Sequence, residues 1–224
     1  MQTFMDYDGT LIFTMHDWVD WINEKEGTSY TISDVLSWDW VTQIQKKLNI
    51  DVFSFFDDSE PYKLKETSLQ PIPGSLKFLM DINKLSEKYS PKILTATHDD
   101  SLKEQKNIHA EHYFPGIEVI HEKDKFKYAI CDIENEPCFL FDDKASSCEK
   151  WVETGGYGIL YTHNGEYPYA KTEMIHPRMK VADTYDEALL FIKEVMKSHQ
   201  DNKIPSTLSE SNEYKEVNNI KPKK

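Results

Sequence analysis

The sequence predicts an α/β fold, a Rossmann-like parallel sheet with helices on both faces and a small, mostly helical cap inserted after the first strand. Three observations lead to this class. Short apolar runs alternate with amphipathic helical stretches from residue 71 onward, which is the pattern of a parallel sheet covered by helices. A helical stretch rich in aromatic residues, 14–70, interrupts this alternation. Polar residues follow the apolar runs, where ligands of such sheets bind.

The expected elements follow from hydrophobic periodicity. Strands are expected at 2–6, 92–97, 117–120, 138–143 and 157–161. Helices are expected at 75–88, 99–113, 125–131, 145–154 and 184–198. In the helix 75–88, the inner side is expected to carry Leu76, Leu79, Met80 and Leu85. Residues 1–13 and 71–198 would form the core and 14–70 the cap, where Trp18, Trp21 and Ile22 recur at helical spacing. The polar residues 199–224 contain too few apolar side chains to offset their chain entropy, so a disordered tail is expected.

Composition narrows the classes of partner. The 224 residues include 26 basic and 39 acidic side chains, a formal net charge of −13. This charge repels a polyanion, so extended nucleic acid is not expected as a partner, whereas a small anion can bind beside a divalent metal. No apolar run approaches the roughly 20 residues that cross a bilayer, and no secretory signal is apparent. We therefore expect a cytoplasmic protein with no membrane partner.

The first apolar run ends in "DYDGT", residues 6–10, and two interpretations compete for it. An Asp-Gly pair between apolar runs is a common signal for a tight turn. Alternatively, Asp6 and Asp8 are two carboxylates at the end of a strand that are aimed at one ligand, and Gly9 allows the backbone to leave the sheet sharply.

Other candidate residues follow later strands. Thr95 ends the expected strand 92–97, Lys125 follows the strand 117–120, and Asp142 and Asp143 end the strand 138–143. Each residue alone has an ordinary explanation, such as a solvated lysine or a helix N-cap. Because the carboxyl ends of parallel strands meet at one edge, we expect all of them to face one crevice.

The residue types at this edge fit phosphoryl transfer. Crowded carboxylates repel one another, and Mg²⁺ relieves such clusters while it keeps room for a phosphate. Asp6 would be the nucleophile, and Asp8, with its pKa raised by its carboxylate neighbours, would be the acid and base. Thr95 would donate a hydrogen bond to a phosphoryl oxygen, and Lys125 would supply positive charge.

The segments "DYDGTL", "ILTAT", "KDK" around Lys125 and "FLFDD" resemble the four motifs of the haloacid dehalogenase-like superfamily of phosphotransferases. The resemblance covers residues 2 to about 165. It implies a Rossmann-like core, magnesium dependence, an Asp6 nucleophile and Asp8 as acid and base. It also implies metal ligation by Asp6, the main-chain oxygen of Asp8, and the Asp142-Asp143 pair, for which we favour Asp143 as the direct ligand and Asp142 through water.

Within that superfamily, the stretches "FFDDSEPYKLKETSLQPIPGSLKFL", "VIHEKDK" and "FLFDDKASSCEKWVETGGYGILYTHNGEYP" resemble the 5'(3')-deoxyribonucleotidases. This likeness implies a homodimer that removes phosphate from deoxynucleoside monophosphates, with cap aromatics around the base. The candidate substrate-binding residues are Phe13, Trp38, Trp40, Phe55, Phe56 and Thr97. The chain reads "DGTLIFTMHDW" where that family tends to read "DGVLADF", so the family's base-contacting aromatic falls near Phe13 or Thr14.

Three alternatives remain open at this point. The chain could act on another small phosphorylated metabolite, or on a terminal phosphate of nucleic acid, although the latter would require a basic groove. It could also be a binding protein that retains the fold without catalysis.

Overall fold

The computed structural model describes residues 1–66, 68–85, 90–129 and 136–203. Its centre is a sheet of six strands in the order β3-β2-β1-β4-β5-β6, with each neighbouring pair parallel. The strands are β1 (Gln2–Met5), β2 (Lys92–Thr95), β3 (Val119–His121), β4 (Cys138–Asp142), β5 (Tyr157–Tyr161) and β6 (Met179–Ala182). This parallel sheet confirms the predicted fold class.

The two central strands of the sheet are β1 and β4. Thr3 of β1 pairs with Phe139 of β4, and Met5 pairs with Phe141. All five residues of β4 are buried, as expected for a strand with helices on both faces, which reads as a continuous apolar run. The strand order places β2, β1 and β4 side by side, so their carboxyl ends lie at one edge of the sheet.

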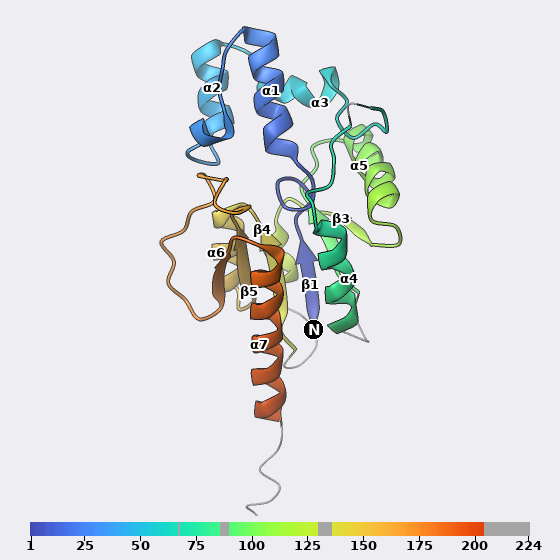
Figure 1. Cartoon of the computed structure of the whole chain (residues 1–224), viewed down its shortest axis with the longest axis vertical. Coiled ribbons are helices and arrows are strands. Elements are labelled where there is room, and N and C mark those ends of the chain that lie inside the picture. Colours follow the sequence, from blue (N-terminus) through green and yellow to red (C-terminus); the bar gives the residue numbers. More distant parts are fainter. Residues whose placement is uncertain (67, 86–89, 130–135, 204–224) are drawn as a thin grey trace, which may run out of the picture.

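Helices cover both faces because successive side chains of a strand point to opposite sides. On one face, α4 (Ser75–Leu85) and α7 (Tyr185–Lys203) lie side by side (Figure 1). Phe78 of α4 contacts Phe141 of β4, with ring centroids 5.0 Å apart. On the other face, Trp151 of α6 (Ala145–Glu153) meets Phe4 of β1 at 5.5 Å. The remaining core helix is α5 (Asp100–Tyr113).

The stretch between β1 and α4 contains α1 (Thr14–Glu26), α2 (Trp40–Leu48) and the short α3 (Phe55–Asp58). Figure 1 shows these helices together beyond the carboxyl end of β1, opposite the N-terminus. Their centre is aromatic: Trp18 stacks on Phe55 with centroids 5.8 Å apart and donates its indole N–H to the Val52 carbonyl at 2.8 Å. The division of the chain into core and cap stays a prediction. The position of these helices, beyond the carboxyl end of β1, is the position expected of a cap.

Several element boundaries differ from the sequence expectations. The strand β6 was not expected, because its four residues include Lys180 and only one fully buried side chain, Ala182. Of the segment 125–131 that was expected as a helix, the first four residues form a short 3₁₀ helix, η3 (Lys125–Tyr128), and residues 130 and 131 lie outside the described residues. Helix α7 continues to Lys203, so residues 199–203 belong to a helix and not to the tail. The rest of the expected tail, 204–224, lies outside the described residues.

The inner face of α4 also needs correction. Leu79 is buried, but Leu76 is 45% and Met80 54% exposed. The helix turns Phe78, Leu79 and Ile82 toward the sheet instead, because this stripe brings the large Phe78 ring onto Phe141. Among the described residues, no helix combines the length and the apolar character needed to cross a membrane.

Candidate active site

Three adjacent strands carry the predicted residues to one edge of the sheet. Asp6 follows β1, Thr95 ends β2, and Asp142 ends β4 with Asp143 directly after it. Lys125 begins η3, which follows β3. The structure therefore brings together the residues that the sequence singled out at the ends of different strands.

The centre of the site is an acidic group formed by Asp6, Asp142 and Asp143. Each offers a carboxylate oxygen, and these oxygens lie within 4.8 Å of one another. All three side chains are buried, with Asp142 and Asp143 fully so. Three buried carboxylates this close cannot all remain charged without nearby cations.

Lys125 provides one such cation. Its Nζ lies 2.8 Å from Oδ1 of Asp6 and 2.7 Å from Oδ2 of Asp142, and the residue is only 8% exposed. The two carboxylates raise the pKa of Lys125 above its ordinary range despite its burial. Lys125 is therefore a fixed positive charge between two acidic side chains, and not the solvated lysine of the alternative interpretation.

One lysine does not neutralise three carboxylates. Burial raises the pKa of Asp6 to about 7, with further contributions from Asp142 and Asp8, although Lys125 opposes the change. Burial and the charges of Asp142 and Asp6 raise the pKa of Asp143 well above its ordinary value. The acidic group is thus short of positive charge.

The donor set fits a divalent cation with oxygen ligands. Asp142 uses Oδ2 for Lys125 and Oδ1 for the main-chain N–H of Lys144, at 2.7 and 2.8 Å. Asp143 accepts a hydrogen bond from the Tyr169 hydroxyl at 2.7 Å through Oδ2, whereas its buried Oδ1 has no hydrogen-bond partner in the described part of the chain. A buried carboxylate oxygen without a partner is costly. This difference favours Asp143 as a direct ligand and Asp142 as an indirect one.

The carboxylate of Asp8 has a different environment from the acidic group. Its Oδ1 accepts hydrogen bonds from the Thr14 hydroxyl, at 2.8 Å, and from the Tyr62 hydroxyl. Its Oδ2 lies 2.5 Å from Nζ of Lys106 and 3.4 Å from Oγ1 of Thr95. Thr14, Tyr62 and Lys106 occupy most of the acceptor positions of this carboxylate, whereas the contact with Thr95 is at the long limit for an O–H donor.

These contacts overturn the expectation that neighbouring carboxylates raise the pKa of Asp8. Burial does raise this pKa, but the charge of Lys106 and the hydrogen bonds from Lys106, Tyr62 and Thr14 outweigh burial, so the net change is downward. Asp8 is therefore an ionised carboxylate at neutral pH. Asp6 and Asp8 differ in their ionisation although they stand two residues apart.

Sequence reasoning missed three residues of this site: Tyr62, Lys106 and Tyr169. Tyr62 and Tyr169 gave no signal, because they reach Asp8 and Asp143 from loops that are distant in sequence. Lys106 did give one. It stands in the buried stripe of α5 with Leu102, His109 and Ala110, and a charge in such a stripe requires a partner.

The predicted aromatic residues divide into two sets. Trp40 and Phe55 are only 6% and 2% exposed and pack in the apolar interior, so the structure does not present them to a ligand. Trp38 and Phe56 are partly buried, and each contacts a tyrosine that donates a hydrogen bond to an aspartate of the site. The Trp38 ring is 5.4 Å from that of Tyr169, and the Phe56 ring is stacked on that of Tyr62 at 6.2 Å.

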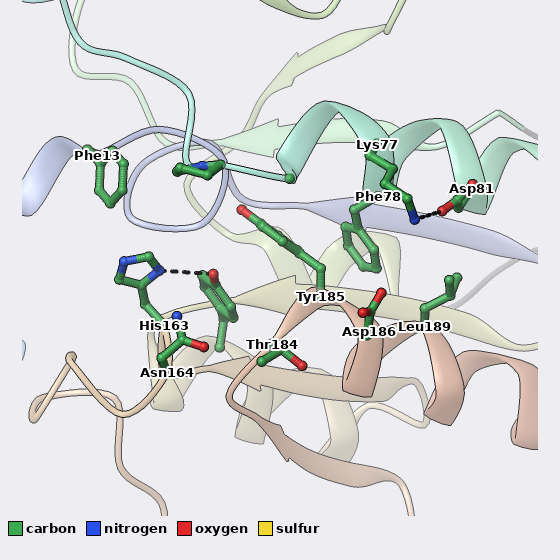
Figure 2. Close-up of a pocket in the computed structure, with 13 residues that line it drawn as sticks. Phe13, Lys77, Phe78, Asp81, His163, Asn164, Thr184, Tyr185, Asp186 and Leu189 are labelled. Atoms are coloured by element: carbon green, nitrogen blue, oxygen red, sulfur yellow. Dashed lines mark hydrogen bonds and ion pairs between the residues drawn. The ribbon is translucent and has the colours of Figure 1, made fainter.

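Phe13 and Thr97 have surroundings different from those of Trp38 and Phe56. Phe13 lines a cavity of about 450 Å³ between the N-terminal parts of α4 and α7, together with Tyr161, His163 and Tyr185 (Figure 2). The lining of this cavity does not include the aspartates of the site. Thr97 shares a hydrogen bond of 2.7 Å with Nδ1 of His121, so its hydroxyl is already engaged with a partly buried side chain.

Comparison with known proteins gives the fold a name. No model of a protein family matches the sequence. No curated protein matches it either. Among solved structures, a haloacid dehalogenase-like hydrolase from Xanthomonas campestris has a TM-score of 0.53 at 16% identity, over 90% of this chain and 98% of its own. One from Burkholderia xenovorans has a TM-score of 0.57 at 14% identity, over 86% and 96%.

A third similar structure is a haloacid dehalogenase-like protein from Agrobacterium tumefaciens, with a TM-score of 0.53 at 13% identity, over 87% of this chain and 98% of its own. The chain thus has the fold of the haloacid dehalogenase-like hydrolases, with a buried acidic group that could hold a metal ion. At these identities the likeness concerns the fold, so the chemistry must be argued from the site.

Proposed function

We propose that this protein is a magnesium-dependent phosphomonoesterase that acts through an aspartyl-phosphate on Asp6. The observation that carries the proposal is the contrast between the two N-terminal aspartates. Asp6 belongs to a buried acidic group with Lys125 and with an Asp143 oxygen that has no hydrogen-bond partner among the residues described, whereas Asp8 is held by its own donors. One aspartate is thus disposed for attack beside a metal, and the other for proton transfer.

The first step uses Asp6. Its Oδ1 accepts hydrogen bonds from Lys125 and from the main-chain N–H of Tyr7, both at 2.8 Å, which directs Oδ2 to the phosphorus atom. The new Oδ2–P bond forms while the bond from phosphorus to the ester oxygen breaks, and the electron pair stays on that oxygen. A proton that has reached Asp8 from solvent passes to the leaving oxygen.

The second step uses Asp8 in the ionised form that the structure favours. A water molecule attacks the phosphorus atom, its proton passes to Asp8, and the bond between phosphorus and Asp6 breaks to release phosphate. A metal ion held by Asp6, the main-chain oxygen of Asp8 and Asp143, with Asp142 acting through water, would supply positive charge to the phosphoryl oxygens. Lys125 supplies a further fixed charge on the side of Asp142.

For the substrate, we propose deoxynucleoside monophosphates. Trp38 and Phe56 support this choice, because they are partly exposed and contact the tyrosines that hydrogen-bond Asp143 and Asp8. Such aromatic rings can stack on a base, a contact that contributes about 1–3 kcal/mol. The net charge of −13 favours a small phosphate ester over extended nucleic acid. The resemblance to deoxyribonucleotidases adds the expectation of a homodimer.

The test is a phosphate-release screen over all nucleoside monophosphates, with Mg²⁺ and with a chelator. We expect release from deoxynucleotides only with Mg²⁺, and no release by Asp6→Asn. Faster turnover of sugar phosphates, or of a 3'-phosphorylated oligonucleotide, would replace the proposed substrate but keep the reaction. Protein that binds Mg²⁺ but hydrolyses no phosphomonoester would instead be a binding protein.

A further inference from the structure

Lys106 is a buried charge that the proposed mechanism does not use. It is 2% exposed and lies on the inner stripe of α5, four residues after Leu102 and three before His109. Helix α5 begins at Asp100, and the carboxylate of its N-cap residue Asp99 accepts a hydrogen bond from the N–H of Leu102 at 2.8 Å. This N-cap fixes the start of α5, and the helical repeat then places Lys106 on the side that faces the ends of β1 and β2.

The ammonium group of Lys106 joins two parts of the site. Its Nζ lies 2.5 Å from Oδ2 of Asp8, 3.1 Å from Oγ1 of Thr95 and 3.1 Å from the carbonyl oxygen of Ala96. The ring of Tyr62 covers the same group, with its centroid 5.1 Å away. A lysine has three N–H donors, and these three acceptors use all of them. Lys106 therefore has no donor left for a ligand.

The contact with Thr95 determines what its hydroxyl can do. Because Oγ1 accepts a hydrogen bond from Lys106, the hydroxyl proton must point elsewhere. Within the described residues, its recorded acceptors are Asp8 Oδ2 and the Ala96 carbonyl, both at 3.4 Å. These distances are at the long limit for an O–H donor. The proton is thus available to a stronger acceptor.

We infer that Lys106 is a positioning residue, which holds Asp8 in place and orients the Thr95 hydroxyl as a donor to a phosphoryl oxygen. This inference rests on the proposed function, because it assumes that a phosphoryl group lies beside Thr95. Lys106 acts through Thr95, so the effect of losing Lys106 must depend on whether the Thr95 hydroxyl is present.

A double-mutant cycle on ligand binding tests this dependence. Orthovanadate serves as the probe for the phosphoryl group, and calorimetry with Mg²⁺ present measures its affinity without any turnover. We expect Lys106→Met and Thr95→Val each to weaken binding by about tenfold, and the double variant to lose about tenfold instead of the hundredfold that independent effects would give. The matched control is Lys103→Met, which removes an exposed lysine from the same helix.

Each outcome decides the inference. A hundredfold loss in the double variant, or a Lys106→Met protein that binds like Lys103→Met, overturns it. If Lys106→Met does not fold, Lys106→Gln repeats the cycle with a neutral side chain that keeps hydrogen-bond donors. Wild-type protein that neither binds orthovanadate nor releases phosphate overturns the proposed function, and this inference with it. Wild-type protein that does both, with independent effects of the two substitutions, overturns this inference alone.

Discussion

Gly9 lies directly against the side chain of Asp143. A Cβ atom at position 9 would come within 2.0 Å of Oδ2 and 2.7 Å of Cγ of Asp143. The φ angle of Gly9 is +71°, a backbone conformation that residues other than glycine rarely adopt. The Asp8-Gly9 pair therefore forms a tight turn, and the missing side chain of Gly9 also leaves the room that Asp143 occupies in the acidic group. The two interpretations of "DYDGT" describe one feature.

The first prediction concerns Gly9→Ala. The methyl group must displace Asp143, so we expect the variant to lose Mg²⁺ binding and phosphatase activity as well as stability. The left-handed backbone alone would cost about 1–2 kcal/mol. Urea unfolding measures the stability, and calorimetry measures Mg²⁺ binding.

The matched control for this substitution is Gly116→Ala. Gly116 has a φ angle of +75°, and a Cβ atom there meets nothing within 4 Å. It therefore carries the same backbone strain without the clash. If the two variants bind Mg²⁺ equally well, the contact between Gly9 and Asp143 does not shape the site.

The sequence predicted the sheet, except for β6, and its acidic edge, because both depend on local patterns. The strand β4 ends in Asp142 and Asp143 within one buried run, and Asp6 follows the buried strand β1 in the same way. The parallel arrangement then brings them together without further information. Periodicity therefore suffices for residues whose positions follow from the strands.

The remaining contacts depend on packing between distant segments. Tyr62 reaches Asp8 across 54 positions of the chain, and Tyr169 reaches Asp143 across 26. No periodic pattern encodes where a loop side chain will point. For the same reason the sequence could not separate Phe55, which is buried, from Phe56, which is only partly buried and stacks on Tyr62, although both rings contact Trp18. Neighbours in sequence face different environments here.

The second prediction concerns the metal. Because the buried Oδ1 of Asp143 lacks a hydrogen-bond partner among the described residues, Mg²⁺ should stabilise the folded protein by mass action. The free energy of unfolding should rise by about 2.7 kcal/mol at a concentration 100 times the Kd. Thermal unfolding with Mg²⁺ and with a chelator measures the effect.

Asp143→Asn should remove most of this stabilisation, because an amide is a weaker ligand and removes one charge from the acidic group. Without metal, the same variant should be at least as stable as the wild type, since it relieves repulsion with Asp6 and Asp142. A full Mg²⁺ effect in Asp143→Asn would show that the cation binds elsewhere.

The third prediction concerns Lys125→Met. This substitution leaves Asp6 and Asp142 buried without their shared cation, and breaking such a pair costs about 3–5 kcal/mol. We expect a large loss of stability in the presence of a chelator and a smaller loss with Mg²⁺, because the metal supplies part of the missing charge. Chemical denaturation with Mg²⁺ and with a chelator measures the loss of unfolding free energy under each condition.

Lys127→Met is the control for Lys125→Met. Lys127 lies in the same 3₁₀ helix but is exposed, and it pairs with Glu122 and Asp124 at the surface. Its removal should change stability by less than about 1 kcal/mol. If Mg²⁺ does not reduce the difference in unfolding free energy between Lys125→Met and the wild type, then Lys125 and the metal do not share the same carboxylates.

The fourth prediction concerns pH and His109, which links Tyr7, just after β1, to Leu69, which precedes α4. Its Nδ1 lies 2.6 Å from the Tyr7 hydroxyl and its Nε2 3.0 Å from the carbonyl oxygen of Leu69. A carbonyl only accepts, so Nε2 donates and Nδ1 accepts from Tyr7, as in a neutral ring. Burial lowers the pKa of His109 from 6.5 to about 4.

The direction in which stability changes with pH follows from proton uptake by His109. Between pH 6.5 and about 4, the unfolded chain binds a proton at His109 that the folded protein does not bind. His109 therefore makes stability fall as the pH decreases through this window, by at most about 1.4 kcal/mol per pH unit. His109→Gln should be less stable at pH 7, because it disturbs the two hydrogen bonds, but its stability should fall less steeply on acidification.

Urea unfolding at several pH values between 4 and 7 measures both slopes, and His112→Gln, an exposed histidine of the same helix, provides the control. The control should keep the wild-type slope, because this substitution leaves the hydrogen bonds of His109 to Tyr7 and Leu69 in place. Parallel curves for His109→Gln and the wild type would mean that the ring between Tyr7 and Leu69 takes up a proton without disrupting the fold, and the neutral tautomer argued from these two hydrogen bonds would then be wrong.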